Sequence, residues 1–146
     1  MSGLAERLAA LADWVTRPST WAGVDLTRVR EAALRGRTGE ALGTWAAAAT
    51  GAAREQLVAA LVRQVRRTPA PVWTALLLVA TAEWLAPVAA RFAEVAPAAE
   101  DVDATVVEAL LEVAVRGSQR RAGRVGTRWL KVQTRRQVIA WLRARG

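Results

Sequence analysis

Apolar residues recur at every third or fourth position along most of the chain, and this spacing is typical of amphipathic α-helices. Near the N-terminus, the residues with this spacing are Leu4, Leu8, Leu11 and Val15. No convincing alternation of apolar and polar residues indicates a strand. The pattern predicts helices over residues 2–15, 25–36, 40–51, 52–68, 71–95, 101–117 and 128–144. We therefore expect an all-α protein, a compact bundle of about six to seven helices that ends in a basic helix.

Capping and helix-breaking residues set the expected helix ends. Asp25 is a suitable N-cap for the short helix over 25–36, and Gly36 is suited to end it. Gly51 either separates the helices before and after it or only kinks one longer helix. Gly117 is expected to end the helix before the basic segment, and Thr127 is a suitable N-cap for the last helix.

Residues 71–95 form the most apolar segment, and its length raises the question of a membrane span. The uncharged run within and before it extends only from Thr68 to Ala82, because Glu83 interrupts it. A span needs roughly 20 apolar residues. Glu83 and Pro87 instead favour the central helix of a bundle, kinked near Pro87. We expect no membrane partner.

The residue types that are absent exclude much chemistry. The chain has 146 residues, 53% of them hydrophobic, with no cysteine and no histidine. This excludes disulfides, thiol nucleophiles, imidazole bases and zinc sites with Cys or His ligands. Neither of the glycine-rich phosphate-binding motifs is present, and no serine lies in a nucleophile-elbow context. We therefore expect a folded protein of one domain, or of one domain and a small appendage, that is not an enzyme and has no cofactor.

Two further patterns concern location and metal binding. The N-terminal apolar run contains Glu6 and Asp13, so it does not resemble a signal peptide, and we expect a cytoplasmic protein. Glu100, Asp101 and Asp103 are three carboxylates within four residues, but no further oxygen ligands follow at the spacing of an ion-binding loop. Acidic residues at a helix start suit its dipole, so capping is the preferred interpretation and no metal is expected.

The charge of the chain is distributed unevenly. Of its 21 basic residues, ten lie in residues 116–146, which contain no acidic residue. The remaining 11 basic residues share residues 1–115 with all 13 acidic ones, so that part has a net charge of −2 and the net +8 comes from the C-terminal block. Twenty of the basic residues are arginine, as a GC-rich genome favours. Their number therefore indicates little about function, whereas their clustering is informative.

Within the basic block, the cations are spaced as they would be along one side of a helix. Arg121, Arg124, Arg128, Lys131 and Arg135 follow one another at intervals of three and four residues. A neighbouring stripe, expected to pack, consists of Val125, Trp129, Val132 and Ile139. A cationic stripe beside aromatic residues and without carboxylates is typical of a surface that follows a phosphate backbone. Two alternatives stay open: an acidic protein partner, or a solvated face without a ligand.

The candidate contacts follow from this interpretation. The basic residues expected to neutralise phosphates are Arg120, Arg121, Arg124, Arg128, Lys131, Arg135, Arg136, Arg143 and Arg145. Trp129 and Trp141 lie within the same block, and either burial in the core or stacking on an exposed base explains an aromatic residue there. DNA is the expected partner, bound with little sequence information and with strong salt dependence.

A resemblance to a known family covers residues 71–145. A long apolar helix is followed by the acidic-started "AEDVDATVVEALLEVAV", and then by a basic loop and "TRWLKVQTRRQVIAWLRARG". This order resembles region 2 of bacterial sigma factors, in a diverged, actinobacterial-type form. In the last string, the matching positions are Trp129, Leu130, Arg135, Ile139, Trp141, Leu142, Arg143 and Arg145.

The resemblance implies a transcription-related module. Region 2 of sigma factors holds RNA polymerase and recognises and melts promoter DNA, so RNA polymerase is a candidate partner. The resemblance divides the chain into a sigma-like helical region, 71–146, and a helical region of unknown role, 1–70. A second hypothesis comes from the residues alone: an Ala-rich helical bundle with an Arg-rich end also suits an interaction or assembly module that binds an acidic partner or itself.

Overall fold

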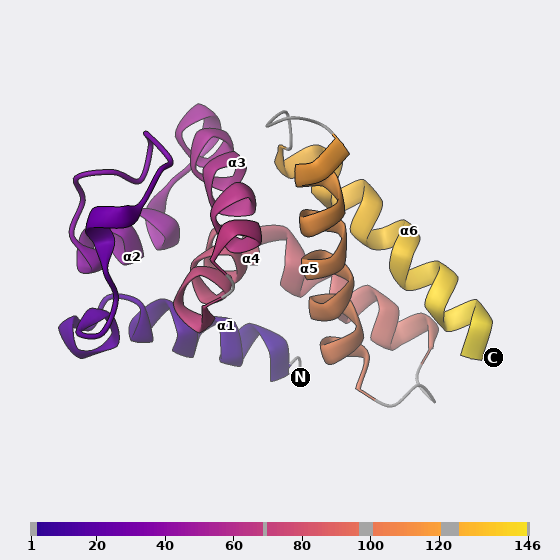
Figure 1. Cartoon of the computed structure of the whole chain (residues 1–146). Helices are drawn as coiled ribbons and strands as arrows, with labels where there is room; N and C mark the ends of the chain where they lie inside the picture. Colours follow the sequence, from indigo (N-terminus) through magenta and orange to yellow (C-terminus); the bar gives the residue numbers. More distant parts are fainter. Residues whose placement is uncertain (1–2, 69, 97–100, 121–125, 146) are drawn as a thin grey trace.

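Six α-helices and two short 3₁₀ helices form the described part of this computed structural model, which covers residues 3–68, 70–96, 101–120 and 126–145 (Figure 1). The elements are α1 (Gly3–Trp14), η1 (Pro18–Trp21), η2 (Leu26–Arg28), α2 (Gly39–Ala48), α3 (Gly51–Arg67), α4 (Pro71–Val95), α5 (Val102–Arg120) and α6 (Thr127–Arg145). No strand occurs in these ranges. The prediction of an all-α bundle that ends in a basic helix is confirmed.

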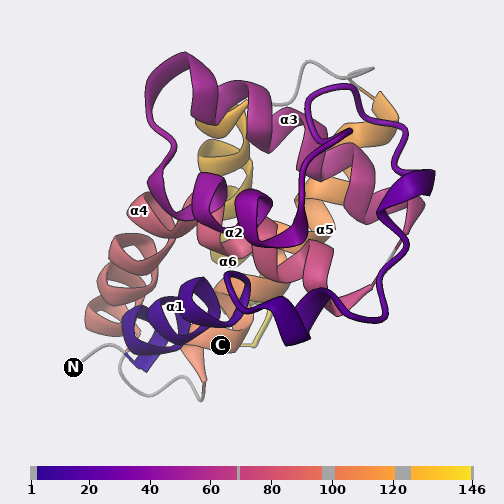
Figure 2. The same ribbon diagram turned by 90° about the vertical axis from the view of Figure 1, so that its left-hand side faces the viewer.

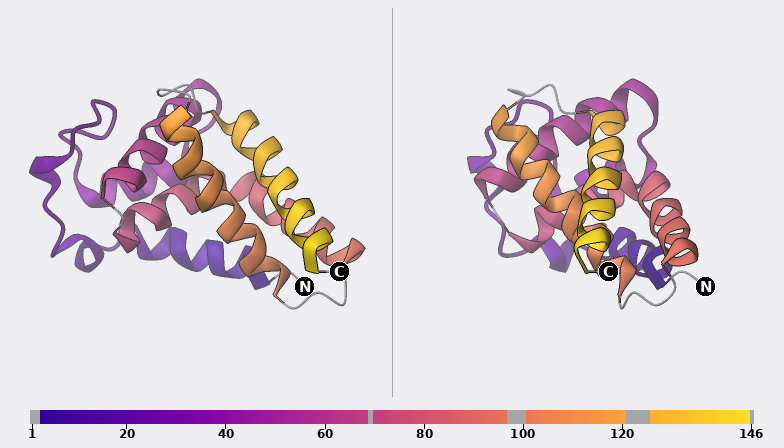
Figure 3. Two further views of the ribbon diagram at one scale, coloured as in Figure 1. Left: turned by 45° about the vertical axis from the view of Figure 1, so that its right-hand side comes forward. Right: turned by 90° about the vertical axis from the view of Figure 1, so that its right-hand side faces the viewer.

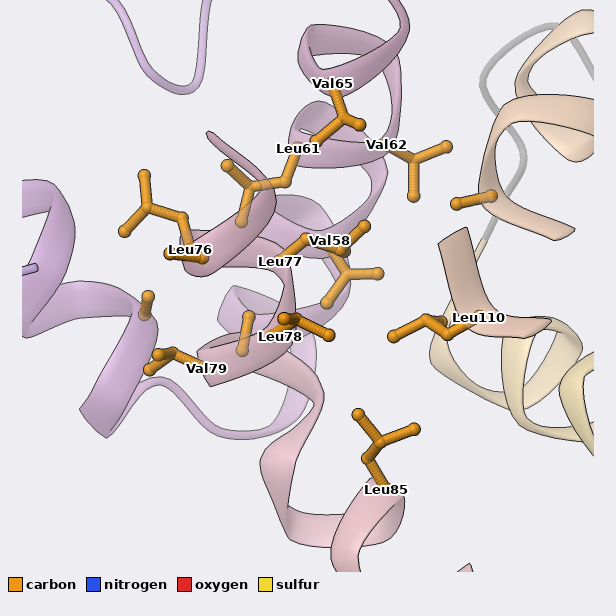
Figure 4. Close-up of a cluster of buried hydrophobic side chains, with 14 of the residues drawn as sticks. Val58, Leu61, Val62, Val65, Leu76, Leu77, Leu78, Val79, Leu85 and Leu110 are labelled. Atoms are coloured by element: carbon orange, nitrogen blue, oxygen red, sulfur yellow. The ribbon is translucent and has the colours of Figure 1, made fainter. Parts of the chain in front are cut away.

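Helix α4 is the centre of the bundle and contacts every other α-helix. Leu76, Leu77 and Leu85 of α4 are fully buried and meet apolar side chains of α3 and α5 (Figure 4). Each such leucine stabilises the fold by about 1.5–3 kcal/mol. One hydrophobic cluster extends from Leu4 in α1 to Val138 in α6, so both sides of residue 70 contribute to the same core.

The apolar composition of α4 is explained by this central position. By length and composition alone the helix is long enough to cross a membrane, but 72% of its most apolar window is buried inside the protein. Glu83 is on the exposed side of α4, where it pairs with Arg54 of α3. The helix continues through Pro87 to Val95.

The N-terminal elements cover one end of α4 (Figure 2). Trp21 of η1 packs edge-on against Trp73 of α4, with ring centroids 5.6 Å apart, and its indole N–H donates to the Val15 carbonyl at 2.8 Å. Gly39 makes this possible, because a Cβ at that position would lie 2.0 Å from the Trp21 ring. Two aromatic residues and one glycine therefore attach α2 to the core.

The predicted α-helix over 25–36 is wrong. Asp25 does accept a hydrogen bond from the Thr27 backbone, but only the 3₁₀ helix Leu26–Arg28 follows, and a turn precedes Gly36 at φ +78°. Glu31 explains the difference, since it is 7% exposed and pairs with Arg63 and Arg67 of α3 at 2.6 Å each. Val29 is buried as well. In a helix, residues two positions apart point to nearly opposite sides, so a surface helix here would not direct both side chains into the same core.

Two other predicted helix boundaries can be compared with the structure. The first is the end of α5: the helix continues past Gly117 to Arg120, so the predicted end at Gly117 is wrong. The second is at Gly51, whose φ of +58° separates α2 from α3. The predicted acidic start of α5 is confirmed, since Asp101 Oδ1 accepts a hydrogen bond from the Ala104 N–H at 3.1 Å.

Candidate nucleic-acid interface

Helix α6 lies against α5 and against the C-terminal half of α4 (Figure 3). Leu130, Thr134 and Val138, one turn apart, are the buried residues of α6. The predicted packing stripe is wrong for Val132 and Ile139, which are each 39% exposed, whereas its member Trp129 is partly buried and packs against the core. Val125, which was assigned to the same stripe, lies outside the described residues. The better signal in the sequence was the four-residue spacing of Leu130, Thr134 and Val138.

The start of α6 is held by a carboxylate from α3. Glu55 Oε2 accepts a hydrogen bond from the Thr127 backbone N–H at 2.9 Å. A Cβ at Gly126 would lie 2.6 Å from the same oxygen, so a larger residue there would require the exposed Glu55 side chain to shift. The expectation that the Thr127 side chain caps the helix is wrong, since its hydroxyl is buried without a hydrogen-bond partner among the described residues.

This contact also affects which groups are available to an anion. The N-terminus of a helix attracts phosphate through its free N–H groups and its dipole. In α6, the Glu55 carboxylate already lies at that position. Phosphates at this surface are therefore expected to be bound by side chains. Sequence analysis missed Glu55, which is 72 residues away from Thr127 and carries no local signal.

The cations of α6 lie on its exposed surface. Arg128, Lys131 and Arg135, three members of the predicted stripe, are all exposed and lie along one side of the helix. Arg136, which follows Arg135 directly, and Arg143, eight residues after Arg135, are exposed as well. None of these five side chains forms an ion pair with a residue that the structure describes. Helix α6 itself contains no acidic residue.

The remaining candidate cations are Arg120, Arg121, Arg124 and Arg145. Arg121 and Arg124 lie outside the described residues, and so do the side chains of Arg120 and Arg145. On the side of α6 that faces α5, Arg116 of α5 donates a hydrogen bond to the Gln137 side chain at 3.2 Å. The described part of the interface thus consists of five exposed cations on a single helix.

Both candidate tryptophans are partly buried and pack against the hydrophobic core. Trp129 also lines an open hollow of about 450 Å³ beside Arg128, Val132 and Glu55. Packing explains the presence of both indoles, and Trp129 in addition shares its hollow with one cation, Arg128. Trp129 is therefore the better placed of the two for contact with a base.

A second hollow lies between α6 and the C-terminal half of α4. It has a volume of about 300 Å³, and its lining residues are Pro87, Val88, Arg91, Phe92, Val95, Lys131, Arg135 and Ile139. Its walls are thus apolar residues together with three cations. Sequence analysis treated residues 87–95 only as core helix and gave no role to this surface.

The acidic triplet has structural partners. Asp101 caps the start of α5, and Asp103 pairs with Arg7 of α1 at 3.1 Å, while Glu100 lies outside the described residues. Within the described ranges, no group of three or more His, Cys, Asp or Glu side chains is arranged to hold a metal ion. The capping role of Asp101 is the one expected from the sequence.

Comparisons of the chain with protein-family models, with curated proteins and with solved structures found no match. The resemblance to sigma region 2 therefore stays a prediction from the sequence. Of its matching positions, Leu130 is buried, Trp129, Trp141 and Leu142 are partly buried, and Arg135, Ile139 and Arg143 are exposed.

Proposed function

We propose that the protein binds nucleic acid, with DNA as the expected ligand, through the exposed cationic surface of α6. The observation that supports this most directly is that Arg128, Lys131, Arg135, Arg136 and Arg143 are exposed and form no ion pair with a described residue. Unpaired cations along one helix release counterions when they meet a phosphate backbone, and this release drives association.

The expected binding mode uses phosphate contacts, with little readout of base sequence. Arginine binds phosphate bidentately, and the three cations Arg128, Lys131 and Arg135 are spaced along about two turns of helix. Contacts of this kind set position and affinity and carry no sequence information directly. The hollow beside Trp129 offers one place where an unpaired base can meet an aromatic edge. A preference for single strands would support the sigma-like interpretation, with RNA polymerase as a further partner.

The first test measures the fluorescence anisotropy of short labelled single- and double-stranded DNA over a salt series. For about five phosphate contacts, log K is expected to fall with log salt at a slope of roughly −4 to −5. Absence of binding at low salt would overturn the proposal.

The second test replaces the three aligned cations in the variant R128E/K131E/R135E. We expect loss of DNA binding with an unchanged helical circular-dichroism spectrum, because all three side chains are exposed. The matched control is R28E/R30E/R66E, which changes the net charge equally at three exposed arginines outside α6. Equal loss in both variants would mean that only net charge matters, and unchanged binding in the α6 variant would refute the interface.

A further inference from the structure

The exposed large apolar side chains of the described residues all lie in one part of the molecule. They are Val95, Val115, Val132 and Ile139, on the end of α4, on α5 and on α6. Val95 is the most exposed, at 76%. No large apolar residue of α1, α2 or α3 is exposed to this degree. Of the four, Val95 and Ile139 line one hollow together, and an exposed apolar patch of this kind marks a surface that another molecule covers.

Two of these residues belong to the hollow between α4 and α6, here called the groove, whose lining residues are those given above. The α6 wall is formed by Lys131, Arg135 and Ile139, at intervals of four residues. Eight residues of helix span about 12 Å, so the groove is about two helical turns long. Its cations, Arg91, Lys131 and Arg135, form no ion pair with a described residue, and no carboxylate lines it.

The chain also exposes a surface with the opposite charge and a matching length. On α5, the residues Glu108, Leu111, Glu112 and Val115, here called the ridge, lie at intervals of three, one and three. This spacing places them on one side of the helix. Glu108 and Glu112 are exposed without a described ion-pair partner, Leu111 is partly buried, and Val115 is 37% exposed.

We propose that the groove of one copy of the chain receives the ridge of a second copy. An apolar helix face that enters an apolar groove is a common mode of recognition, with anchor residues one turn apart. Here Leu111 and Val115 would meet Phe92, Val95 and Ile139. The two ridge carboxylates would meet the three groove cations. Each group would then find a partner of opposite charge, which none of them has among the described residues of a single copy.

The arrangement of the helices favours a closed dimer. Helix α6 lies between α5 and the end of α4 (Figure 3), so the ridge and the groove lie on either side of it. A two-fold axis parallel to α6, and beside it on its exposed side, brings each ridge to the groove of the other copy at the same time. Reciprocal contacts of this kind close after two subunits.

The shape of the groove suits a ridge of side chains better than an enclosed small molecule. A volume of about 300 Å³ is at the lower limit of small-molecule pockets, which bury most of their ligand. Val95 at the edge of the groove is 76% exposed, so that side remains open. A second helix would cover it.

The inference does not depend on the proposed function, although Lys131 and Arg135 belong to both surfaces. Arg91, Val95 and the whole ridge lie outside α6 and outside the proposed DNA contacts. Changes restricted to these residues therefore test self-association without removing a DNA-binding cation.

The experiment measures mass by light scattering and sedimentation velocity over a concentration series at moderate salt. The wild-type mass is expected to rise from that of a monomer to that of a dimer. In R91E/V95E and in E108R/E112R, the dissociation constant is expected to rise about tenfold or more, because like charges then face each other. R66E and E6R, at exposed positions of α3 and α1, are controls expected to dimerise normally. A wild-type chain that stays monomeric would overturn the proposal, as would normal dimerisation of either variant.

A charge exchange identifies the two surfaces as partners. The variants R91E/R135E and E108R/E112R are each expected to remain monomeric, whereas an equimolar mixture is expected to form a heterodimer. In the mixture, every ridge meets a groove of opposite charge. Circular dichroism of each variant confirms that the fold is retained, and Gln at the same positions is the milder alternative if a variant does not fold. A mixture that stays monomeric would show that ridge and groove do not meet.

Discussion

Arginine is used differently in the two halves of the molecule. The six described ion pairs all take their cation from α1–α3 or the segments between them, at Arg7, Arg17, Arg28, Arg54, Arg63 and Arg67. The five described cations of α6 take part in none. Four of these pairs, those of Arg7, Arg54, Arg63 and Arg67, join segments that are far apart in the sequence, whereas an unpaired cation remains available to a ligand. Ion pairs between distant segments thus stabilise the first half, and the cations of α6 are left available for binding.

The largest expected effect concerns the paired charges, at Glu31. The change E31A removes the buried carboxylate between Arg63 and Arg67, which leaves two guanidinium groups close together. Both side chains can still reach solvent, being 30% and 46% exposed, so we expect a loss of about 2–3 kcal/mol in the free energy of unfolding. Urea denaturation measures it. The control D13A removes the exposed pair with Arg17 and should change stability by less than about 1 kcal/mol.

The second prediction supplies α6 with the carboxylates that it lacks. Val132 lies four residues from both Arg128 and Arg136, and Ile139 lies four residues from both Arg135 and Arg143. In V132E/I139E, each new carboxylate pairs with cations of its own helix. We expect DNA affinity to fall about tenfold or more at low salt although no cation is removed. V132Q/I139Q is the neutral control, and equal affinity of the two variants would argue against the electrostatic mechanism.

How much of the fold could be predicted from the sequence depends on whether a contact is local or joins residues far apart in the chain. Helix periodicity depends on neighbours three and four residues apart, so α1, α3, α4 and α6 were predicted from local pattern alone. The segment 25–36 also has a helical pattern, but the buried pairing of Glu31 with α3 decides its shape, and that pairing spans 32 and 36 residues. Local pattern could not show that contact.

The candidate site was predicted in part for a similar reason. Clustered cations with a helical spacing show which residues share a side of α6, and this needs no tertiary contact. Which side packs depends on α4 and α5, so the exposure of Val132 and Ile139 was not foreseen. Glu55 and the groove depend on residues from two separate helices, and no spacing along the chain indicates either of them.

The third prediction concerns the junction between the halves, at Glu55. In E55A the Thr127 N–H loses its acceptor, and the loss of a helix cap of this kind amounts to about 1 kcal/mol. Because the contact is exposed and lies at a helix end, the effect is expected to be local, as faster hydrogen exchange of the first turn of α6. E55Q keeps an acceptor oxygen and should retain most of the protection. Equal exchange in E55A and the wild type would show that Glu55 does not hold α6.

The smallest expected effect lies where α6 packs on the core. Thr134 is fully buried between Leu130 and Val138, and its hydroxyl has no hydrogen-bond partner among the described residues. The change T134V keeps the side-chain shape and removes the unpaired hydroxyl, so we expect stability to rise by up to about 1 kcal/mol.

Thr81 in α4 is the matched control for this change. It is equally buried, but its hydroxyl donates to the Leu77 and Leu78 carbonyls at 2.9 and 3.2 Å, so T81V should leave stability unchanged or lower it. Thermal unfolding followed by circular dichroism compares the two variants. If T134V is as destabilising as T81V, the Thr134 hydroxyl has a partner after all. If T134V stabilises the protein, the unpaired Thr134 hydroxyl weakens the packing of α6 on the core, whereas the paired Thr81 hydroxyl does not weaken that of α4.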